Sequence, residues 1–283
     1  MKNIFGMNVK TMTENSINID GKPFIVKTVD GELTRKQDAL EKEGKAFEKT
    51  AAPWWLKALY YLGIYGGLLC LVIFLRLALE KDFKDFPASV YWFLGIGLLL
   101  VAVWGVAFYS LKKRTKSVQN SSSFQYREER VEKVLEETHA ELGIPSDAKL
   151  CDVFGCAYKV KSNGKTKPVN LMAEYVTLEV SVFREEEALC LADAQMKLKI
   201  PFENIRRFYR VNKRAMSSGW NKPTRFNKGE YKQYKIRTNQ YGTLFIKPYY
   251  VLEIYYQSED YQLKFPCYEY ETFRALLGRD AEI

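Results

Sequence analysis

Two long runs of apolar residues dominate the first half of the chain and predict a pair of helices. The first run covers residues 54–79 and is uncharged from Ala58 to Leu75, and the second covers 87–111 and has no charged residue. A spanning helix needs about 20 mostly apolar residues, so both runs are long enough to cross a bilayer. The alternative is two buried helices in a soluble core. Trp and Tyr at the ends of the runs favour a membrane interface, so we predict a transmembrane hairpin over 54–111.

The charges that flank the two runs predict their orientation. Residues 80–86 form a short connection, so the two helices must be antiparallel neighbours. Cations lie on the outer side of both runs, namely Lys42, Lys45 and Lys49 before the first and Lys112, Lys113, Arg114 and Lys116 after the second. Cations in short flanks are retained in the cytoplasm. We therefore expect a multi-pass protein of the cell membrane with both termini cytoplasmic.

Small residues recur in both runs, where they let helix backbones approach closely. They are Gly63 and Gly67 in the first run, at GxxxG spacing, and Gly95, Gly97, Ala102 and Gly105 in the second. Packing of the hairpin against itself is the favoured interpretation, and a homodimer face is the alternative. The centre of each run is free of charged residues, so nothing there predicts an ion or proton path.

Residues 1–53 form a charged segment that we expect in the cytoplasm. Residues 17–26 suggest a hairpin around Asp20 and Gly21, although Pro23 weakens that interpretation because proline cannot donate to a strand ladder. Residues 33–49 suggest a short helix with Thr34 as its N-cap. The alternative for the whole segment is a solvated tail.

A linker and a helix are expected over residues 112–148. Residues 117–123 are polar and suggest a linker. Apolar residues then recur at helical spacing over 126–142, and Gly143 and Pro145 are typical helix-ending residues.

The remaining residues, 149–283, are predicted to form a β-rich domain. Runs of apolar, aromatic and alternating residues predict strands at 149–161, 175–183, 188–191, 196–200, 205–211, 231–237, 249–256 and 261–265. Asn163-Gly164 is a turn signal, and a final helix is expected over 268–277. The expected fold class is α+β, in which the transmembrane hairpin precedes a sandwich or partly open barrel with a C-terminal helix.

The order of many antiparallel strands and one final helix resembles a pleckstrin-homology-like domain. The segment Ile-Pro-Phe-Glu-Asn-Ile at 200–205 is similar to the strand-entry segment of bacterial pleckstrin-homology-like proteins of the YcxB-like kind. The residues at 261–266 and 273–277 are similar to them in layout. That family tends to place the domain behind a pair of transmembrane helices. The resemblance covers about residues 149–278, departs from the compact pattern in an insertion at 212–230, and implies no catalytic residue.

Positive charge is concentrated in one stretch of this domain. Residues 206–237 hold eleven Lys or Arg and one acid, Glu230, so this basic window contributes +10 to a chain whose net charge is +9. We expect an exposed loop at 212–228 that rests on anionic lipid headgroups, with each nearby cation contributing ~1 kcal/mol and a tryptophan as interfacial anchor. The predicted contact residues are Lys213, Arg214, Trp220, Lys222, Arg225 and Lys228. The alternative is a solvated face of a basic protein.

The sequence lacks the motifs of the common enzyme classes. There is no phosphate-binding loop, dinucleotide fingerprint, G-x-S-x-G or H-E-x-x-H. The chain has a single histidine, His139, and five scattered cysteines, which are few candidate ligands for a metal site. The odd number of cysteines fits reduced thiols in a cytoplasmic domain. We expect no catalytic residue, no metal and no cofactor.

These observations predict a non-enzymatic, membrane-anchored binding module with a basic loop. Its partner would be an anionic lipid of the inner leaflet or a protein near the membrane. The alternative function is a scaffold or regulatory subunit that binds a protein partner without lipid specificity, and a homodimer is also compatible. Basic and aromatic residues interleave as in nucleic-acid-binding proteins, but the membrane anchor disfavours that class.

Overall fold

The computed structural model describes residues 1–9, 17–80, 88–169, 173–218, 229–239 and 242–282. The chain divides into two compact units. Unit 1 comprises Met1–Thr34 and Leu135–Ile283, and unit 2 comprises Arg35–Val134. Helices and a largely antiparallel sheet are both present, which confirms the mixed α and β composition, and the two apolar helices lie in the N-terminal half.

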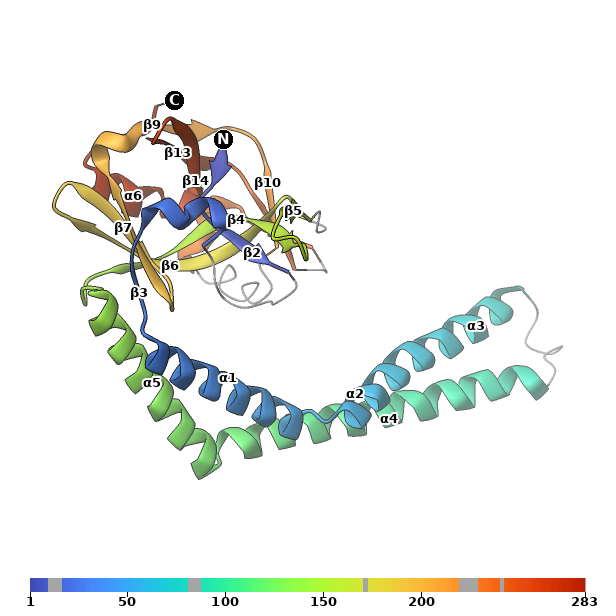
Figure 1. The fold of residues 1–283 in the computed structure, drawn as a ribbon. Helices are drawn as coiled ribbons and strands as arrows, with labels where there is room; N and C mark the ends of the chain where they lie inside the picture. The colour runs from blue at the N-terminus through green and yellow to red at the C-terminus, as the bar shows by residue number, and fades with distance from the viewer. Residues whose placement is uncertain (10–16, 81–87, 170–172, 219–228, 240–241, 283) are drawn as a thin grey trace. The chain divides into compact units, whose positions relative to one another are not determined.

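The helices that precede the main β-rich region confirm the sequence pattern with longer bounds (Figure 1). They are α1 (Gly31–Ala51), α2 (Trp54–Tyr61), the π-helical turn η2 (Leu62–Gly66), α3 (Gly67–Glu80), α4 (Ala88–Gln119) and α5 (Ser122–Leu142). The stretches Trp54–Leu77 and Tyr91–Gln119 are each long and apolar enough to cross a membrane.

Glycines bring the two apolar helices close together. A Cβ on Gly63 would lie 2.7 Å from the main-chain nitrogen of Trp104, and one on Gly67 would lie 3.3 Å from the carbonyl oxygen of Gly97. A Cβ added to Gly95, in contrast, would have no neighbouring atom within 4 Å. Gly63 and Gly67 therefore pack against the other apolar helix, because a side chain at either position would push the two helices apart.

Helix α1 begins earlier than the sequence suggested. The Asp30 side chain accepts a hydrogen bond of 2.6 Å from the Leu33 amide, which is the role of an N-terminal cap. Thr34 instead lies inside the helix, and its hydroxyl donates to the Asp30 carbonyl. The predicted cap at Thr34 is therefore wrong, because the aspartate four residues earlier satisfies the first free amides.

The polar stretch at 117–123 is mostly helical rather than a linker. Helix α4 continues to Gln119, and α5 starts at Ser122, which leaves Asn120 and Ser121 between them. The Ser121 hydroxyl accepts a hydrogen bond of 3.3 Å from the Phe124 amide, so a serine restarts the helix directly. At its other end, α5 stops before Gly143, whose φ is +64°, as the sequence predicted.

Most of the predicted strands are present in unit 1. The strands are β1 (Lys2–Asn3), β2 (Gly6–Asn8), β3 (Ile25–Thr28), β4 (Lys149–Val160), β5 (Thr166–Pro168), β6 (Tyr175–Glu185), β7 (Ala188–Ala192), β8 (Met196–Pro201), β9 (Ile205–Val211), β10 (Ala215–Ser218), β11 (Arg237–Thr238), β12 (Thr243–Ile246), β13 (Tyr249–Tyr256) and β14 (Glu259–Pro266). Short 3-10 turns lie at η1 (Ile19–Phe24), η4 (Phe202–Asn204), η5 (Gly229–Tyr234) and η6 (Cys267–Glu269), before the final helix α6 (Tyr270–Leu277).

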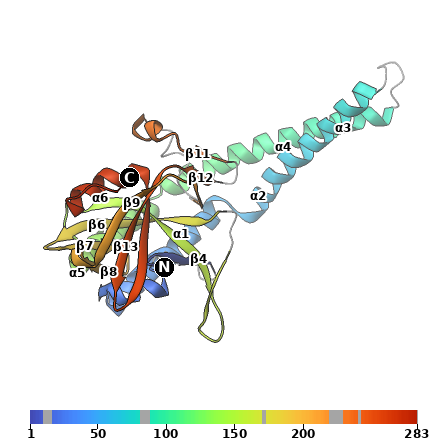
Figure 2. The same ribbon diagram turned by 90° about the horizontal axis from the view of Figure 1, so that it is seen from above.

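Two antiparallel meanders build the sheet. Strands β4, β6, β7 and β8 pair in order, and β9, β13 and β14 form the second group (Figure 2). A single pair, Lys264 and Phe154, joins β14 to β4. Strand β8 pairs with β3 and β7, and β9 pairs with β13, so the described strands form a sheet that is partly open between β8 and β9.

Helix α6 closes the main core. Phe273 is fully buried, and its ring stacks on Phe265 with the ring centroids 3.8 Å apart. Tyr270 stacks on Tyr250 of β13 at 4.6 Å. Apolar side chains on one face of this short helix thus cover the inner face of the second meander, where the Tyr270 ring also lies 5.9 Å from the Phe208 ring of β9.

The N-terminal residues belong to unit 1 rather than to a separate segment. Strands β1 and β2 lie parallel to β14 and β4, and β3 lies antiparallel to β8. Ile4, Phe5 and Phe24 are buried in the main core. The predicted hairpin around Asp20 is wrong, since residues 19–24 form the 3-10 turn η1. Strands of two to four residues have too few side chains for a periodic pattern to reveal them.

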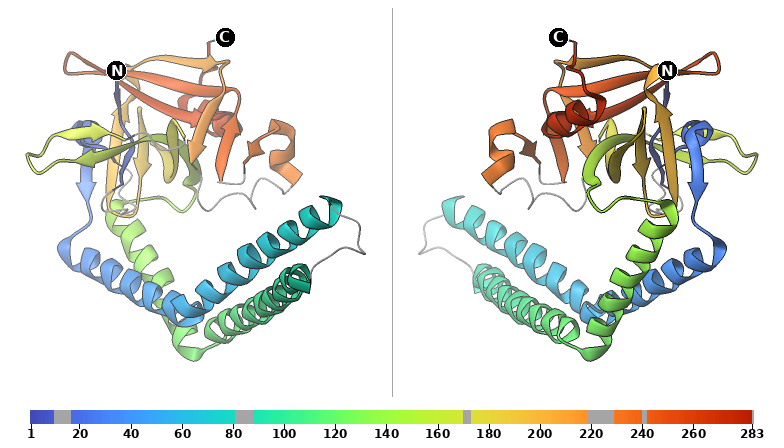
Figure 3. Two further views of the ribbon diagram at one scale, coloured as in Figure 1. Left: turned by 90° about the vertical axis from the view of Figure 1, so that its right-hand side faces the viewer. Right: turned by 90° about the vertical axis from the view of Figure 1, so that its left-hand side faces the viewer.

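The segment between β9 and β13 departs most from expectation. The predicted strand at 231–237 is wrong, because 229–234 form η5 and β11 begins at Arg237. Strands β10 and β12 were not predicted, and β10 pairs antiparallel with β12 and parallel with β6. Figure 3 shows η5 and β11, in orange, at one side of the domain. The insertion thus extends beyond the predicted 212–230 to residue 248, just before β13, and it adds a small second core around Leu244 and Ile246.

Candidate functional site

The six predicted contact residues do not form one described loop. Trp220, Lys222, Arg225 and Lys228 lie outside the residues that the structure describes. Lys213 and Arg214 are described and exposed, and they directly precede β10. Within the expected loop at 212–228, residues 215–218 instead form β10, in which Ala215 and Ser217 are buried.

The first two arginines of the basic window interact with acidic and aromatic residues. Arg206 lies 3.9 Å from a carboxylate oxygen of Asp260 and 3.4 Å from the ring centroid of Tyr255. Arg207 donates two hydrogen bonds, of 3.0 and 2.8 Å, to one carboxylate oxygen of Glu282. These two side chains have their own partners, so the charge available to a ligand lies further along the chain.

A cleft of about 500 Å³ opens where the insertion meets β9 and the end of β14. Eleven residues line it, and they are Arg210, Asn212, Arg214, Gln233, Tyr234, Lys235, Arg237, Phe245, Lys247, Pro248 and Cys267. Five of the eleven are cations, and none of the lining residues that the structure describes is a carboxylate. We call this site the basic cleft.

Different elements position the five cations. Arg210 is on β9, and Arg214 immediately precedes β10. Lys235 follows η5 in a left-handed conformation with φ of +51°, which turns the chain before Arg237 opens β11. Lys247 lies between β12 and β13. The fold therefore brings together charges that lie up to 37 positions apart in the sequence, between Arg210 and Lys247.

The charge of the basic cleft is not balanced by the described residues. None of its five cations forms an ion pair with a carboxylate in the parts of the chain that the structure describes. Burial raises the pKa of the Cys267 thiol to about 11, and burial likewise raises the pKa of Tyr234. Both groups are therefore neutral near pH 7, and the cleft has a formal charge of +5 from its five cations.

A second hollow in the same unit shows a different charge arrangement. Its lining includes Glu271, Arg274, Arg279 and Asp280. Arg274 lies 3.2 Å from Glu271 and 2.7 Å from Asp280, so acids and cations are matched there. Of the two hollows, the basic cleft is the one that would attract an anion.

The cysteines of unit 1 are held as thiols. Burial is the largest cause that raises the pKa of Cys151, and it also raises the pKa of Cys190 to about 12. A nucleophilic cysteine needs a lowered pKa, whereas the environment of these two cysteines raises their pKa. Within the described residues, no group of three or more His, Cys, Asp and Glu side chains could hold a metal ion.

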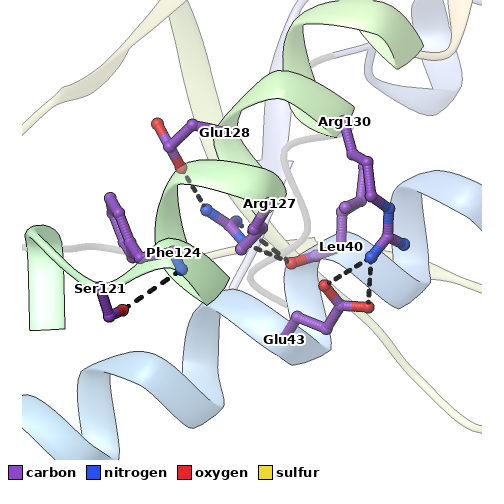
Figure 4. A network of polar contacts seen from close by, with 7 residues as sticks. All are labelled: Leu40, Glu43, Ser121, Phe124, Arg127, Glu128 and Arg130. Atoms are coloured by element: carbon purple, nitrogen blue, oxygen red, sulfur yellow. Dashed lines mark hydrogen bonds and ion pairs between the residues drawn. The ribbon is translucent and has the colours of Figure 1, made fainter.

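A second polar arrangement lies within unit 2, between α1 and α5 (Figure 4). Arg127 donates through Nε and Nη2 to the carbonyl oxygen of Leu40, and Arg130 makes two contacts of 3.1 Å with Glu43. The rings of Phe47 and Phe124 meet edge to face at 5.5 Å. Sequence reasoning missed this contact, because charged residues on a helix surface usually indicate a solvated face.

The five cations of the basic cleft could hold an anion. Guanidinium and ammonium groups donate charge-assisted hydrogen bonds to phosphate or carboxylate oxygens. The signal that could have found it is the concentration of cations from Arg210 to Arg237, combined with Lys247, which falls outside the basic window. Comparison of this chain with protein-family models, with curated proteins and with solved structures found no match.

Proposed function

We propose that this chain is an integral membrane protein whose pleckstrin-homology-like cytoplasmic domain is a binding module. In this proposal the domain engages an anionic partner at the inner membrane surface through the basic cleft and catalyses no reaction. The observation on which it depends is the cluster of five cations that form no ion pair with any described carboxylate, in a domain joined covalently to two long apolar helices. The tether keeps the domain at a high effective concentration near the lipid surface.

The exposure of the apolar side chains on the two long helices supports a location in a membrane. In each candidate span, 11% of the most apolar stretch is buried within the protein. A core helix of a soluble protein would be mostly buried, because exposing so many apolar side chains to water costs ~25 cal/mol for each Å². Exposed residues such as Leu69, Trp92 and Leu99 would instead face lipid. Cations in both outer flanks favour cytoplasmic termini.

The order of elements supports the pleckstrin-homology-like assignment. Four antiparallel strands, three further antiparallel strands and a closing helix follow one another as the resemblance implies, apart from the insertion between β9 and β13. The resembling segment at 200–205 leaves β8, passes through η4 and enters β9. Asn204 donates a hydrogen bond of 2.9 Å to the Tyr255 carbonyl, which ties this entry to β13.

Binding of a peptide as an added strand at the edge of β9 is disfavoured, because residue 282 already forms hydrogen bonds there. The Glu282 amide donates to the Phe208 carbonyl at 2.7 Å, and the Arg210 amide donates to the Glu282 carbonyl at 3.0 Å. Residue 282 thus already occupies part of the edge that an added strand would use. A scaffold function through β9 would first have to displace this segment.

The test uses the full chain in phosphatidylcholine nanodiscs with or without phosphatidylglycerol. Amide hydrogen exchange would be measured on β11 and β12, which line the basic cleft. We expect slower exchange with the anionic lipid and loss of that effect at high salt. The triple variant Arg210→Ser/Arg237→Ser/Lys247→Ser should lose the effect. A matched control, Lys161→Ser/Lys165→Ser/Lys167→Ser on the exposed β4–β5 hairpin, should keep it.

Two results would contradict the proposal. If the rate of amide exchange in β11 and β12 is the same with and without anionic lipid, the basic cleft does not contact lipid, and a protein partner is favoured. An effect abolished by the hairpin variant but retained by the cleft variant would move the contact to the β4–β5 hairpin. Exchange in the core strands serves as the internal check that each variant is folded.

A further inference from the structure

The composition of the basic cleft narrows the chemistry of its ligand. Three of its five cations are arginines, Arg210, Arg214 and Arg237, and the other two are Lys235 and Lys247. An arginine presents a planar fork of N–H donors that matches the oxygens of a phosphate group, whereas lysine acts as a point charge. This mixture, with no carboxylate among the described lining residues, is typical of phosphate recognition.

The amount of charge indicates more than one phosphate. A phosphate monoester has a charge of roughly −1.5 to −2 near neutral pH. One phosphate group would leave most of the +5 of the cleft unbalanced, and a second group on the same molecule would leave less, whether the two are monoesters or the singly charged diesters of a lipid. The volume agrees, because about 500 Å³ lies within the range of roughly 300–1,000 Å³ that is usual for small-molecule sites.

The uncharged residues of the lining complete the site. Asn212 and Gln233 have amide groups that can donate to phosphate oxygens, and the Tyr234 hydroxyl keeps its proton near neutral pH. Phe245 and Pro248 offer an apolar surface to the organic part of a ligand. The Arg214 guanidinium lies 6.0 Å from the Phe245 ring centroid, so this ring also helps to position a cation.

We infer that the basic cleft binds a molecule with two phosphate groups, either in a lipid headgroup or in a free diphosphate compound. This inference rests on the proposed function, because it names the class of anion that the same cleft would take. The two sources share the chemistry that the five cations recognise, and two experimental arms distinguish them.

The first arm titrates inorganic pyrophosphate into the full chain in phosphatidylcholine nanodiscs, followed by calorimetry. We expect pyrophosphate to bind more tightly than orthophosphate or sulfate. Removing one cation should weaken binding about fivefold, if each contributes ~1 kcal/mol. The triple variant at Arg210, Arg237 and Lys247 should therefore weaken it about a hundredfold, while the hairpin triple variant at Lys161, Lys165 and Lys167 should not.

The second arm compares nanodiscs with cardiolipin, which has two phosphates, and with phosphatidylglycerol at equal total charge. Stronger protection of β11 and β12 by cardiolipin would support the inference and identify the source as a lipid, whereas tight pyrophosphate binding without that preference would identify a free compound. Absence of any two-phosphate preference in both arms would overturn the inference. If phosphatidylglycerol still protected the cleft, the proposed function would survive that failure. If it did not, both would fail.

Discussion

The guanidinium of Arg127 on α5 donates two hydrogen bonds, each 3.1 Å long, to the main-chain carbonyl of Leu40 on α1. Gly44 leaves the space for this contact, since a Cβ there would lie 2.6 Å from Nη2 of Arg127. The Arg127 side chain is 18% exposed, so most of it is shielded from water. The contact joins the helix that precedes the first apolar run to the helix that follows the second (Figure 4).

We predict that Gly44→Ala destabilises the protein only while Arg127 is present. Alanine is better than glycine inside a helix by about 1 kcal/mol. The added methyl would displace the guanidinium, and a hydrogen bond to a charged group contributes about 1.5–3 kcal/mol. The measurement is thermal unfolding in detergent for Gly44→Ala, Arg127→Ala and the double variant.

The double variant is the control for this prediction. Once Arg127 is alanine, Gly44→Ala should raise the stability by about 1 kcal/mol, because the gain in helix propensity remains without the clash. An equal effect of Gly44→Ala in both backgrounds would show that the two residues are not coupled.

We predict a pH-dependent contribution from the ion pair of Glu185 and Lys197. Lys197 is only 9% exposed at its side chain, and its hydrogen bond holds the pKa of Glu185 below the ordinary value. A carboxylate with a lowered folded pKa adds stability above its unfolded pKa and loses it as the pH falls through the folded pKa. Glu185→Gln should thus lower the midpoint of denaturation near neutral pH by a modest amount, because Glu185 is 33% exposed.

The check on this pair compares the two proteins across pH. The difference between wild type and Glu185→Gln should shrink as the pH approaches about 3, below the usual glutamate range. A difference that stays constant with pH would mean that lost packing, rather than charge, explains the variant.

The elements that the sequence predicted well are those with many patterned side chains. The apolar runs, the helix ending at Leu142 and the alternating strand β6 all have enough periodic positions to reveal them. Strands β1, β2 and β11 have two or three residues each, and their existence depends on partners that are distant in the sequence. Local patterns have no information about such pairing.

We predict that the segment around Glu282 protects the edge of β9. Glu282→Pro would remove the amide that donates to the Phe208 carbonyl at 2.7 Å, because proline has no N–H. The Arg210 amide, which donates to the Glu282 carbonyl, should then exchange its hydrogen faster. Glu282→Gln is the matched control, since it keeps the backbone contacts. Equal exchange of the Arg210 amide in both variants would contradict this account.

We predict that Phe273→Ala is among the more costly single changes in unit 1. The ring is fully buried and stacks on Phe265, so its removal should cost about 3–5 kcal/mol. The measurement is denaturant unfolding of the full chain in detergent. Leu276→Ala on the same helix, where the residue is only partly buried, should cost less. The reverse order would show that α6 does not close the core in this way.

The basic cleft could be predicted from the sequence only in part. The concentration of cations between Arg206 and Arg237 was visible, but their separation into paired and unpaired groups was not. Arg207 is engaged by Glu282, which lies 75 positions away, and Lys247 enters the cleft from beyond the basic window. Both facts depend on how β9, β12 and the final residues meet in three dimensions.

The most direct test of the central claim is photo-crosslinking in intact cell membranes. A benzoylphenylalanine placed at Phe245, in the lining of the basic cleft, would report what occupies the cleft, and the same probe at the exposed Val160 on β4 serves as control. The account predicts lipid adducts, or adducts of a phosphorylated small molecule, at Phe245 and few at Val160. Adducts to one protein at Phe245, or identical products at both positions, would contradict it.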